Sequence, residues 1–318
     1  MSMQTRLLPP FAHVRRAHAA TCARTAAQGR CPIARSALAL SAVAVILLAR
    51  TGSTAPAQRI VSLIPAVTEM LFAIGDGQRI VGVTNYDRFP PEVSRLVRVG
   101  GLLDPDVERI LALRPDLVVL YNTQVELKQR LDRAHIDYYS YEHRALPDIT
   151  TTLRAIGARI GSGPRANAAA AGMEGAIAAI RKSVSGAPRP RTLLIFERDR
   201  TALRSVFASG GYGFLHDMLE TAGGENVFAD VKRQSVEAST EMILARKPDV
   251  IIELWYGDLA KDLDLSRLPL AWNAFGSVPA VRNHRVYELA GDEFVVPGPR
   301  VVAATRRLAE TLHPGTLK

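Results

Sequence analysis

Cysteine is nearly absent from this chain of 318 residues, and both copies, Cys22 and Cys31, lie within the first 57 residues. If that segment is removed, the rest of the protein has no disulfide, no thiol nucleophile and no cysteine metal ligand. Neither cysteine directly follows the apolar stretch of the segment, so the cysteine of a lipid anchor is also missing.

Recognisable catalytic motifs are missing too. A nucleophile elbow, a phosphate loop and a dinucleotide fingerprint are absent, and the glycines at 210–213 lack the spacing and the preceding strand of a cofactor loop. Five histidines follow residue 57, and none pairs at the three- or four-residue spacing that places two metal ligands on one helix face. We therefore expect no catalytic residue, no metal site and no enzyme. His143, at the end of a predicted strand, stays an alternative metal ligand.

Acidic residues are lacking in the first 57 positions, which contain seven arginines. An uncharged stretch of 14 residues, SALALSAVAVILLA at 36–49, is followed by small residues that end at Ala55-Pro56-Ala57. A basic region, an apolar core and a small-residue cleavage site are the three parts of a secretory signal peptide. We predict a signal peptide at 1–57 and a periplasmic protein, with an uncleaved membrane anchor as the alternative.

The positive charge of the chain belongs mostly to this leader. The whole chain has 40 basic and 31 acidic residues, and without the seven leader arginines 33 basic residues face 31 acidic ones. Nucleic-acid binding would need a clustered basic face on the remaining protein. We therefore expect no nucleic-acid partner.

After residue 57, predicted strands and helices alternate along the chain. Buried-strand patterns occur at 59–64, 80–83, 117–121, 137–141, 192–196 and 285–289, with helical patterns between them. This alternation predicts an α/β fold with mostly parallel sheets. The alanine-rich stretch at 165–185 has no strand signal and predicts one long helix. We expect a first lobe at 58–160, a bridging helix at 161–188 and a second lobe at 189–318.

A twelve-residue stretch occurs twice. ERILALRPDLVV at 108–119 returns 133 positions later as EMILARKPDVII at 241–252, with six identical residues. Each copy predicts a short helix, a Pro-Asp stop and a buried strand, and each places a glutamate, Glu108 or Glu241, in the first helical turn. The repeat indicates two lobes built alike, each with one acidic group.

Aromatic and charged residues gather in the loops that follow the predicted strands. Aromatic rings with a few orienting charges are typical of ligand clefts. The candidate residues are Tyr86, Arg88, Phe89, Arg198, Arg200, Arg204, Tyr212, Trp255, Tyr256, Asp292, Glu293 and Phe294.

From residue 59 to the C-terminus, the chain resembles the periplasmic binding proteins for cobalamin, haem and ferric siderophores that serve ABC importers. The similarity is carried by RIVSLIPAVTEMLFAIG, RIVGVTNYDRFPPEV, DVERILALRPDLVV, LHDMLETAGGENVF, STEMILARKPDVII and PAVRNHRVY, in this order. The cobalamin branch is the most similar. The resemblance implies two αβ lobes bridged by one long helix, a ligand held between them and little hinge motion. It also implies a monomer without a cofactor.

The resemblance also assigns roles to residues. Glu108 and Glu241 match the glutamates that dock into arginine-lined pockets of the permease. Ligand contacts are implied for Tyr86, Pro65-Ala66 and Asp292. The chain departs from the family where stacking tryptophans fall on Leu102, near Ser235 and on Glu293.

Because of these departures, the sequence does not decide between several ligands. The leading expectation is a corrinoid, and the alternatives are haem or a ferric siderophore. For these, the arginine-rich loop at 198–204 would bind acidic groups, and Tyr86, Tyr141 or His143 would be an axial donor for haem. An exported metal-dependent enzyme on the same scaffold is the least favoured reading.

Overall fold

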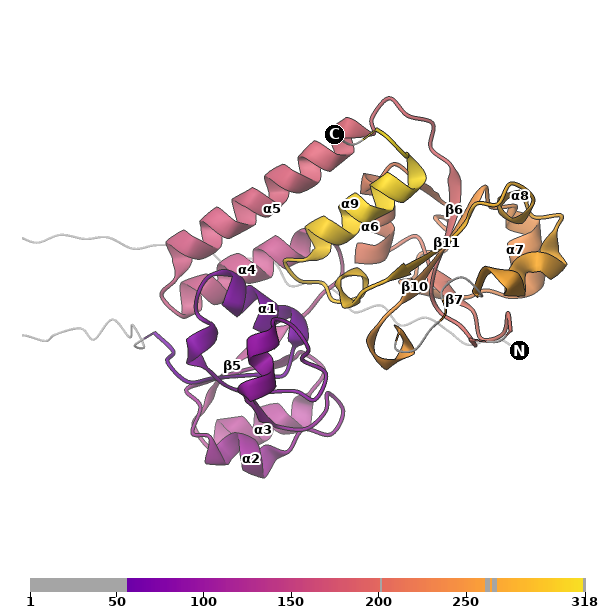
Figure 1. Cartoon of the computed structure of the whole chain (residues 1–318). Coiled ribbons are helices and arrows are strands. Elements are labelled where there is room, and N and C mark those ends of the chain that lie inside the picture. Colours follow the sequence, from indigo (N-terminus) through magenta and orange to yellow (C-terminus); the bar gives the residue numbers. More distant parts are fainter. Residues whose placement is uncertain (1–55, 201, 261–263, 265–267, 317–318) are drawn as a thin grey trace, which may run out of the picture. The chain divides into compact units, whose positions relative to one another are not determined.

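The computed structural model describes residues 56–316, apart from 201, 261–263 and 265–267. The predicted signal peptide, except for Pro56 and Ala57, lies outside the described residues, as do both cysteines. The described residues belong to one compact unit, Thr54–Lys318. Figure 1 shows that this unit contains two sheets, one formed by strands between residues 60 and 141 and one by strands between 191 and 290.

The first sheet is entirely parallel, with the strand order β3-β2-β1-β4-β5. Its central strand is fully buried, as expected for a strand covered on both faces. The helices between its strands make the crossovers. The elements are β1 Ile60–Ser62, α1 Pro65–Ala73, η1 Gly77–Arg79, β2 Ile80–Val83, η2 Pro91–Arg95, β3 Val97–Arg98, α2 Val107–Ala112, β4 Leu117–Tyr121, α3 Val125–Arg133 and β5 Asp137–Tyr141.

The second sheet is mixed, with the order β11-β10-β6-β7-β9 and β8 paired to β6. Strands β8, β6, β10 and β11 run parallel, while β7 pairs antiparallel with both β6 and β9. Its elements are β6 Arg191–Glu197, β7 Phe207–Ser209, α6 Phe214–Thr221, β8 Glu225–Asn226, β9 Ser235–Glu237, α7 Thr240–Arg246, β10 Val250–Trp255, η3 Gly257–Ala260, η4 Leu268–Phe275, α8 Pro279–Arg282, β11 Val286–Ala290 and η5 Asp292–Phe294.

The predicted long helix is present as α5, Gly163–Ser183, but it does not stand alone. It packs closely against α4, Pro147–Arg159, and against α9, Val301–Leu312, the last helix in the sequence (Figure 1). A Cβ at Gly157 would lie 2.1 Å from the Cβ of Ala166, so glycine permits the close approach of α4 and α5. The connection between the lobes is therefore a helical layer.

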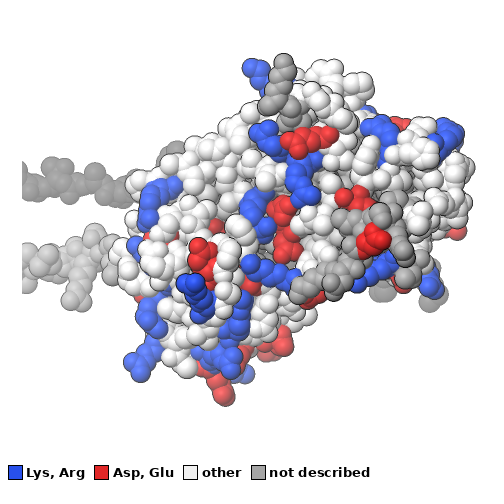
Figure 2. Space-filling model, in the orientation of Figure 1, with Lys and Arg blue, Asp and Glu red and all other residues white. Residues whose placement is uncertain are grey.

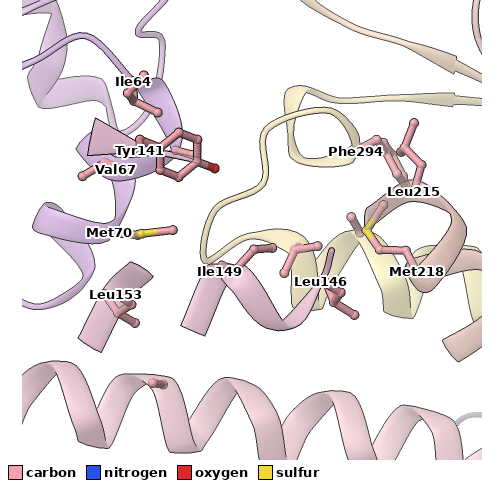
Figure 3. Close-up of a cluster of buried hydrophobic side chains, with 14 of the residues drawn as sticks. Ile64, Val67, Met70, Tyr141, Leu146, Ile149, Leu153, Leu215, Met218 and Phe294 are labelled. Atoms are coloured by element: carbon pink, nitrogen blue, oxygen red, sulfur yellow. The ribbon is translucent and has the colours of Figure 1, made fainter. Parts of the chain in front are cut away.

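One hydrophobic core runs through both lobes. In Figure 3, Met70 and Tyr141 of the first lobe, Ile149 of α4, and Met218 and Phe294 of the second lobe belong to the same buried cluster. Buried apolar area stabilises a fold by about 25 cal/mol per Å². Separating the lobes would expose part of this shared core, which opposes a wide hinge motion.

The repeated sequence has a structural basis in both lobes. Each short helix is followed by a residue in the left-handed conformation, Arg114 with φ 47° and Lys247 with φ 48°. The aspartate of each Pro-Asp pair then binds the start of the neighbouring strand. The Asp116 carboxylate accepts from the backbone N–H of Arg59 at 2.9 Å, and the Asp249 carboxylate from that of Arg191 at 3.2 Å. The structural role of the two aspartates thus accounts for their presence in both copies of the repeat.

Candidate functional site

Loops that follow parallel strands of the two sheets meet between the lobes. Nη2 of Arg88, after β2, lies 2.9 Å from Oδ2 of Asp258, after β10. Nη2 of Arg200 donates to the backbone oxygen of Asp258, also at 2.9 Å. Oδ1 of Asp292, after β11, accepts from the N–H of Gly257 at 2.7 Å. The carboxyl ends of strands in open α/β sheets are where such proteins hold ligands.

Tyr86 stands on a rigid turn of this region. Thr84 donates to Oδ2 of Asp87 through its N–H at 2.8 Å and its hydroxyl at 2.6 Å. Arg98 donates to the backbone oxygens of Thr84 and Asp87 at 2.6 and 2.9 Å. Burial raises the pKa of Asp87, while its hydrogen bonds with threonines act in the opposite direction. The Tyr86 side chain remains 61% exposed, so a fixed backbone presents an accessible ring.

Pro65 and Ala66 begin α1, and a Cβ at Gly298, in the segment that enters α9, would lie 3.5 Å from the backbone oxygen of Ala66. Glu69, one turn further along α1, is buried and accepts from Arg300 at 2.6 and 3.0 Å. The guanidinium of Arg300 also lies 4.3 Å from the ring centre of Phe89. Burial raises the pKa of Glu69, and Arg300 opposes that rise. This ion pair ties the first lobe to the C-terminal segment.

Three predicted ligand contacts lie inside the second lobe. The Arg198 side chain is fully buried and donates to both oxygens of Glu253, at 2.6 and 2.7 Å. Trp255 is buried beneath the Arg198 guanidinium, 5.2 Å from ring centre to Cζ. Phe294 is buried in the shared core. This burial argues against their predicted contact with a ligand, since each of the three side chains already packs in the interior of the protein.

Sequence reasoning missed a second acidic residue beside this ion pair. Glu288 of β11 lies directly opposite Glu253 of β10 in the parallel register and accepts from the indole N–H of Trp255. Burial, followed by the nearby negative charge of Glu253, raises the pKa of Glu288 to about 9. The protonated acid can then donate to Glu253. The sequence gives only a weak signal for this pair, which is a single glutamate within each of the strands β10 and β11.

Tyr141 ends the edge strand β5 of the first sheet, His143 follows two residues later, and both have unsatisfied polar atoms. Both ring nitrogens of His143 and the hydroxyl of Tyr141 are buried without a hydrogen-bond partner. The two rings stack at 6.3 Å, and Phe214 of the second lobe meets His143 edge-on at 5.0 Å. Burial lowers the pKa of His143, and burial raises that of Tyr141. Neutral polar atoms thus lie between the lobes.

The remaining predicted residues have simpler surroundings. Tyr212 precedes α6 and is exposed. Leu102 is half-buried, and its backbone oxygen accepts from Gln124 at 2.9 Å. Within the described residues, no group of three or more His, Cys, Asp or Glu side chains could hold a metal ion. Over those same residues, no helix has the length and apolar character to cross a membrane.

Glu108 and Glu241 are both exposed, and neither takes part in the strand contacts made by the repeated aspartates. The Ser239 side chain lowers the pKa of Glu241 by hydrogen bonding to its carboxylate. Figure 2 shows acidic and basic side chains interspersed over the visible face, without a continuous basic patch among the described residues.

Comparison with known proteins identifies relatives with this architecture. The family model described as periplasmic binding protein matches residues 60–293. The vitamin B12-binding protein of Salmonella typhimurium is 30% identical over 259 residues, which are 80% of this chain and 90% of that protein. An uncharacterized ABC transporter substrate-binding lipoprotein of Bacillus subtilis, YvrC, is 26% identical over 266 residues, 82% of each chain.

Solved structures share the fold. The periplasmic vitamin B12 binding protein BtuF of Vibrio cholerae superposes with a TM-score of 0.69 at 23% identity, over 83% of this chain and 99% of that one. The periplasmic heme-binding protein RhuT from Roseiflexus sp. RS-1 gives 0.69 at 25% identity, over 81% and 99%. These relatives are binding proteins of transport and not enzymes. The chain therefore belongs to the periplasmic binding protein family.

Proposed function

We propose that this protein captures a corrinoid between its two lobes outside the cytoplasm and delivers it to an ABC permease. The observation that carries the ligand class is the 30% identity to a vitamin B12-binding protein over 90% of that relative. The geometry supports it, because an exposed ring on a rigid turn lies beside the contact between the lobes.

In this proposal, Tyr86 supplies a flat apolar surface for one face of the corrin ring. Pro65-Ala66 provide a close backbone approach at the start of α1. Arg88 and Asp292 orient the polar groups at the edge of the ligand, since carboxylates accept from amides and guanidinium groups donate to carbonyl oxygens. The exposed Tyr212 contributes from the second lobe.

A haem or ferric siderophore is the second candidate. It is favoured by the unpartnered polar atoms of His143 and Tyr141, because either side chain can be an axial donor to iron. It is disfavoured by Arg198, whose guanidinium is committed to Glu253 and does not face an acidic ligand. Arg200 and Arg204 are exposed and remain the basic groups of that loop toward solvent.

Delivery requires a docking surface that does not overlap the ligand contacts. We propose that Glu108 and Glu241 pair with arginines of the permease. Both side chains are exposed, so their carboxylates are accessible to a partner in the free protein. Charge pairs at an interface mainly set orientation and association rate.

The test is calorimetric titration of protein lacking residues 1–57 with cyanocobalamin, haemin and a ferric catecholate. The proposal expects saturable binding of cyanocobalamin at a stoichiometry of one. Binding of haemin alone, with a Soret shift that His143→Ala removes, would replace the corrinoid with haem. Failure of all three ligands to bind would refute the proposed ligand class.

A further inference from the structure

A groove lies beside Glu108 in the first lobe. It encloses about 730 Å³ between the loop at 102–107 and the start of α3. Two large apolar side chains line it in spite of their exposure to solvent: Leu103 is 96% exposed and Val125 is 57% exposed. Adjacent exposed apolar side chains on a concave surface are typical of a contact site.

The loop that carries Leu103 is fixed from several directions. Gly100 has φ +91°, and a Cβ there would lie 2.6 Å from the backbone oxygen of Asp104, so this turn needs glycine. The N–H of Asp106 donates to the oxygen of Val99 at 2.9 Å. Gln124 accepts from the N–H of Tyr121 and donates to the oxygen of Leu102, both at 2.9 Å. Leu103 therefore lies on a preorganised turn, which lowers the entropy cost of a contact.

The charges that line the groove are mostly negative. Four carboxylates and one arginine face it: Asp104, Asp106, Glu108, Glu126 and Arg130. A smaller hollow of about 530 Å³ on the other side of Glu108 has the opposite balance, with Arg130 and Arg133. A basic segment is therefore complementary to the larger groove and repelled by the smaller one.

The second lobe lacks the counterpart of this turn. In the register of the repeat, Leu103 corresponds to Val236, which lies in strand β9 and is buried against the second sheet. Asp106 corresponds to Ser239, which caps α7 through its hydroxyl at 3.3 Å from the N–H of Met242. The surroundings of Glu108 and Glu241 thus differ, although the two glutamates occupy equivalent positions.

We propose that this groove receives a basic segment of the ABC permease that carries an aliphatic side chain beside its lysine or arginine. The inference rests on the proposed docking of Glu108. The aliphatic side chain packs against Leu103 and Val125, and the cation faces the carboxylates. The first lobe then docks through an apolar contact at Leu103, whose counterpart in the second lobe, Val236, is buried, so the two ends of the protein are distinguishable to the permease.

The experiment measures docking without ligand. The permease that receives the ligand is reconstituted in phosphatidylcholine nanodiscs, and binding of the exported protein is followed by biolayer interferometry. Leu103→Ser and Val125→Ser each remove one apolar contact, and Leu270→Ser changes a similarly exposed leucine, 59% exposed, in the second lobe. We expect the first two to weaken docking roughly 10- to 150-fold, the range for losing one buried aliphatic side chain, and the third to leave it unchanged.

Two results would overturn the inference: docking of Leu103→Ser equal to that of the original protein, or a dimer in solution that Leu103→Ser converts to a monomer, which would assign the groove to a second copy. Ligand affinity is measured on the same variants with cyanocobalamin and haemin. Loss of docking with no ligand bound by any variant would refute the proposed ligand while leaving the groove assigned. Intact ligand binding with unaltered docking would refute the groove alone.

Discussion

Replacing Glu288 with glutamine tests whether the buried pair in the second lobe holds a proton at neutral pH. The carboxyl group lies opposite Glu253, and the buried cation beside them, Arg198, is already paired with Glu253. Burial and the charge of Glu253 raise the pKa of Glu288 from 4.5 to about 9. The folded protein therefore binds one proton more than the unfolded chain between these values.

The sign and size of the effect follow from linkage. A raised pKa in the folded state contributes stability that is fully present below pH 4.5 and is lost as the pH rises through about 9. Each pH unit in this window corresponds to about 1.4 kcal/mol, so at pH 7 up to about 3 kcal/mol has been lost. Glutamine resembles the protonated acid, because its amide can donate to Glu253 and its oxygen can accept from Trp255. We expect Glu288→Gln to be more stable at pH 7 by up to about 3 kcal/mol and nearly equal to the original at pH 4.5.

The assay is urea unfolding followed by circular dichroism at pH 4.5, 7 and 9. The difference in free energy of unfolding between the variant and the original protein should grow with pH. Taking this difference cancels the contribution of the other titrating groups. Glu253→Gln is the matched control, because it removes the carboxylate that accepts both hydrogen bonds from the buried Arg198 guanidinium. It should destabilise the protein by about 3–5 kcal/mol. A Glu288→Gln protein with the same pH dependence as the original would refute the protonated pair.

Three further changes separate ligand binding, docking and architecture. Tyr86→Ala should weaken ligand binding by about 1–3 kcal/mol, and unchanged calorimetric affinity in both it and Asp292→Ala would remove these residues from the site. The Glu108→Ala/Glu241→Ala double variant should abolish uptake into proteoliposomes while ligand affinity stays intact; normal uptake would make the glutamates architectural. Asp116→Ala should lower the free energy of unfolding by about 1–3 kcal/mol, since two backbone N–H groups lose their acceptor, and equal urea midpoints would contradict this.

The sequence predicted the elements whose stability depends on local pattern. Strand β4 is predicted at its observed residues, because buried parallel strands are continuous and apolar. Strand β5 is also predicted at its observed residues, although it is a partly exposed edge strand, because its three tyrosines favour strand. Helix α4 was not predicted. Its segment, PDITTTLRAIGAR, contains three threonines and a glycine, which favour helix weakly, and its close packing against α5 outweighs that preference. Strands β7 and β9 have three residues each and exist through antiparallel pairing with neighbours distant in sequence.

The exposure of some candidate residues was predictable from the sequence, whereas pairing with residues remote in the chain was not. Tyr86 and the two repeated glutamates are exposed, as expected for residues of a cleft and a docking face. Arg198 is predicted as a ligand contact because it lies in a loop after a strand, where charged and aromatic residues gather. Its partner, Glu253, is 55 residues away in the middle of an apolar strand, and no local pattern connects them. The same holds for Glu69 and Arg300, which are 231 residues apart.

The arrangement of the core bears on how a ligand could leave. Residues of the first lobe, α4 and the second lobe share one buried cluster, and the Glu69–Arg300 ion pair adds a second link between α1 and the C-terminal segment. Separating the lobes would break a largely buried ion pair, which is costly when one partner loses the other. Exchange through movement of exposed groups such as Tyr86 and Arg88 leaves these links intact. Docking at two separated points, Glu108 and Glu241, would then act on a nearly rigid body. Release of the ligand would depend on the permease binding both lobes at the same time.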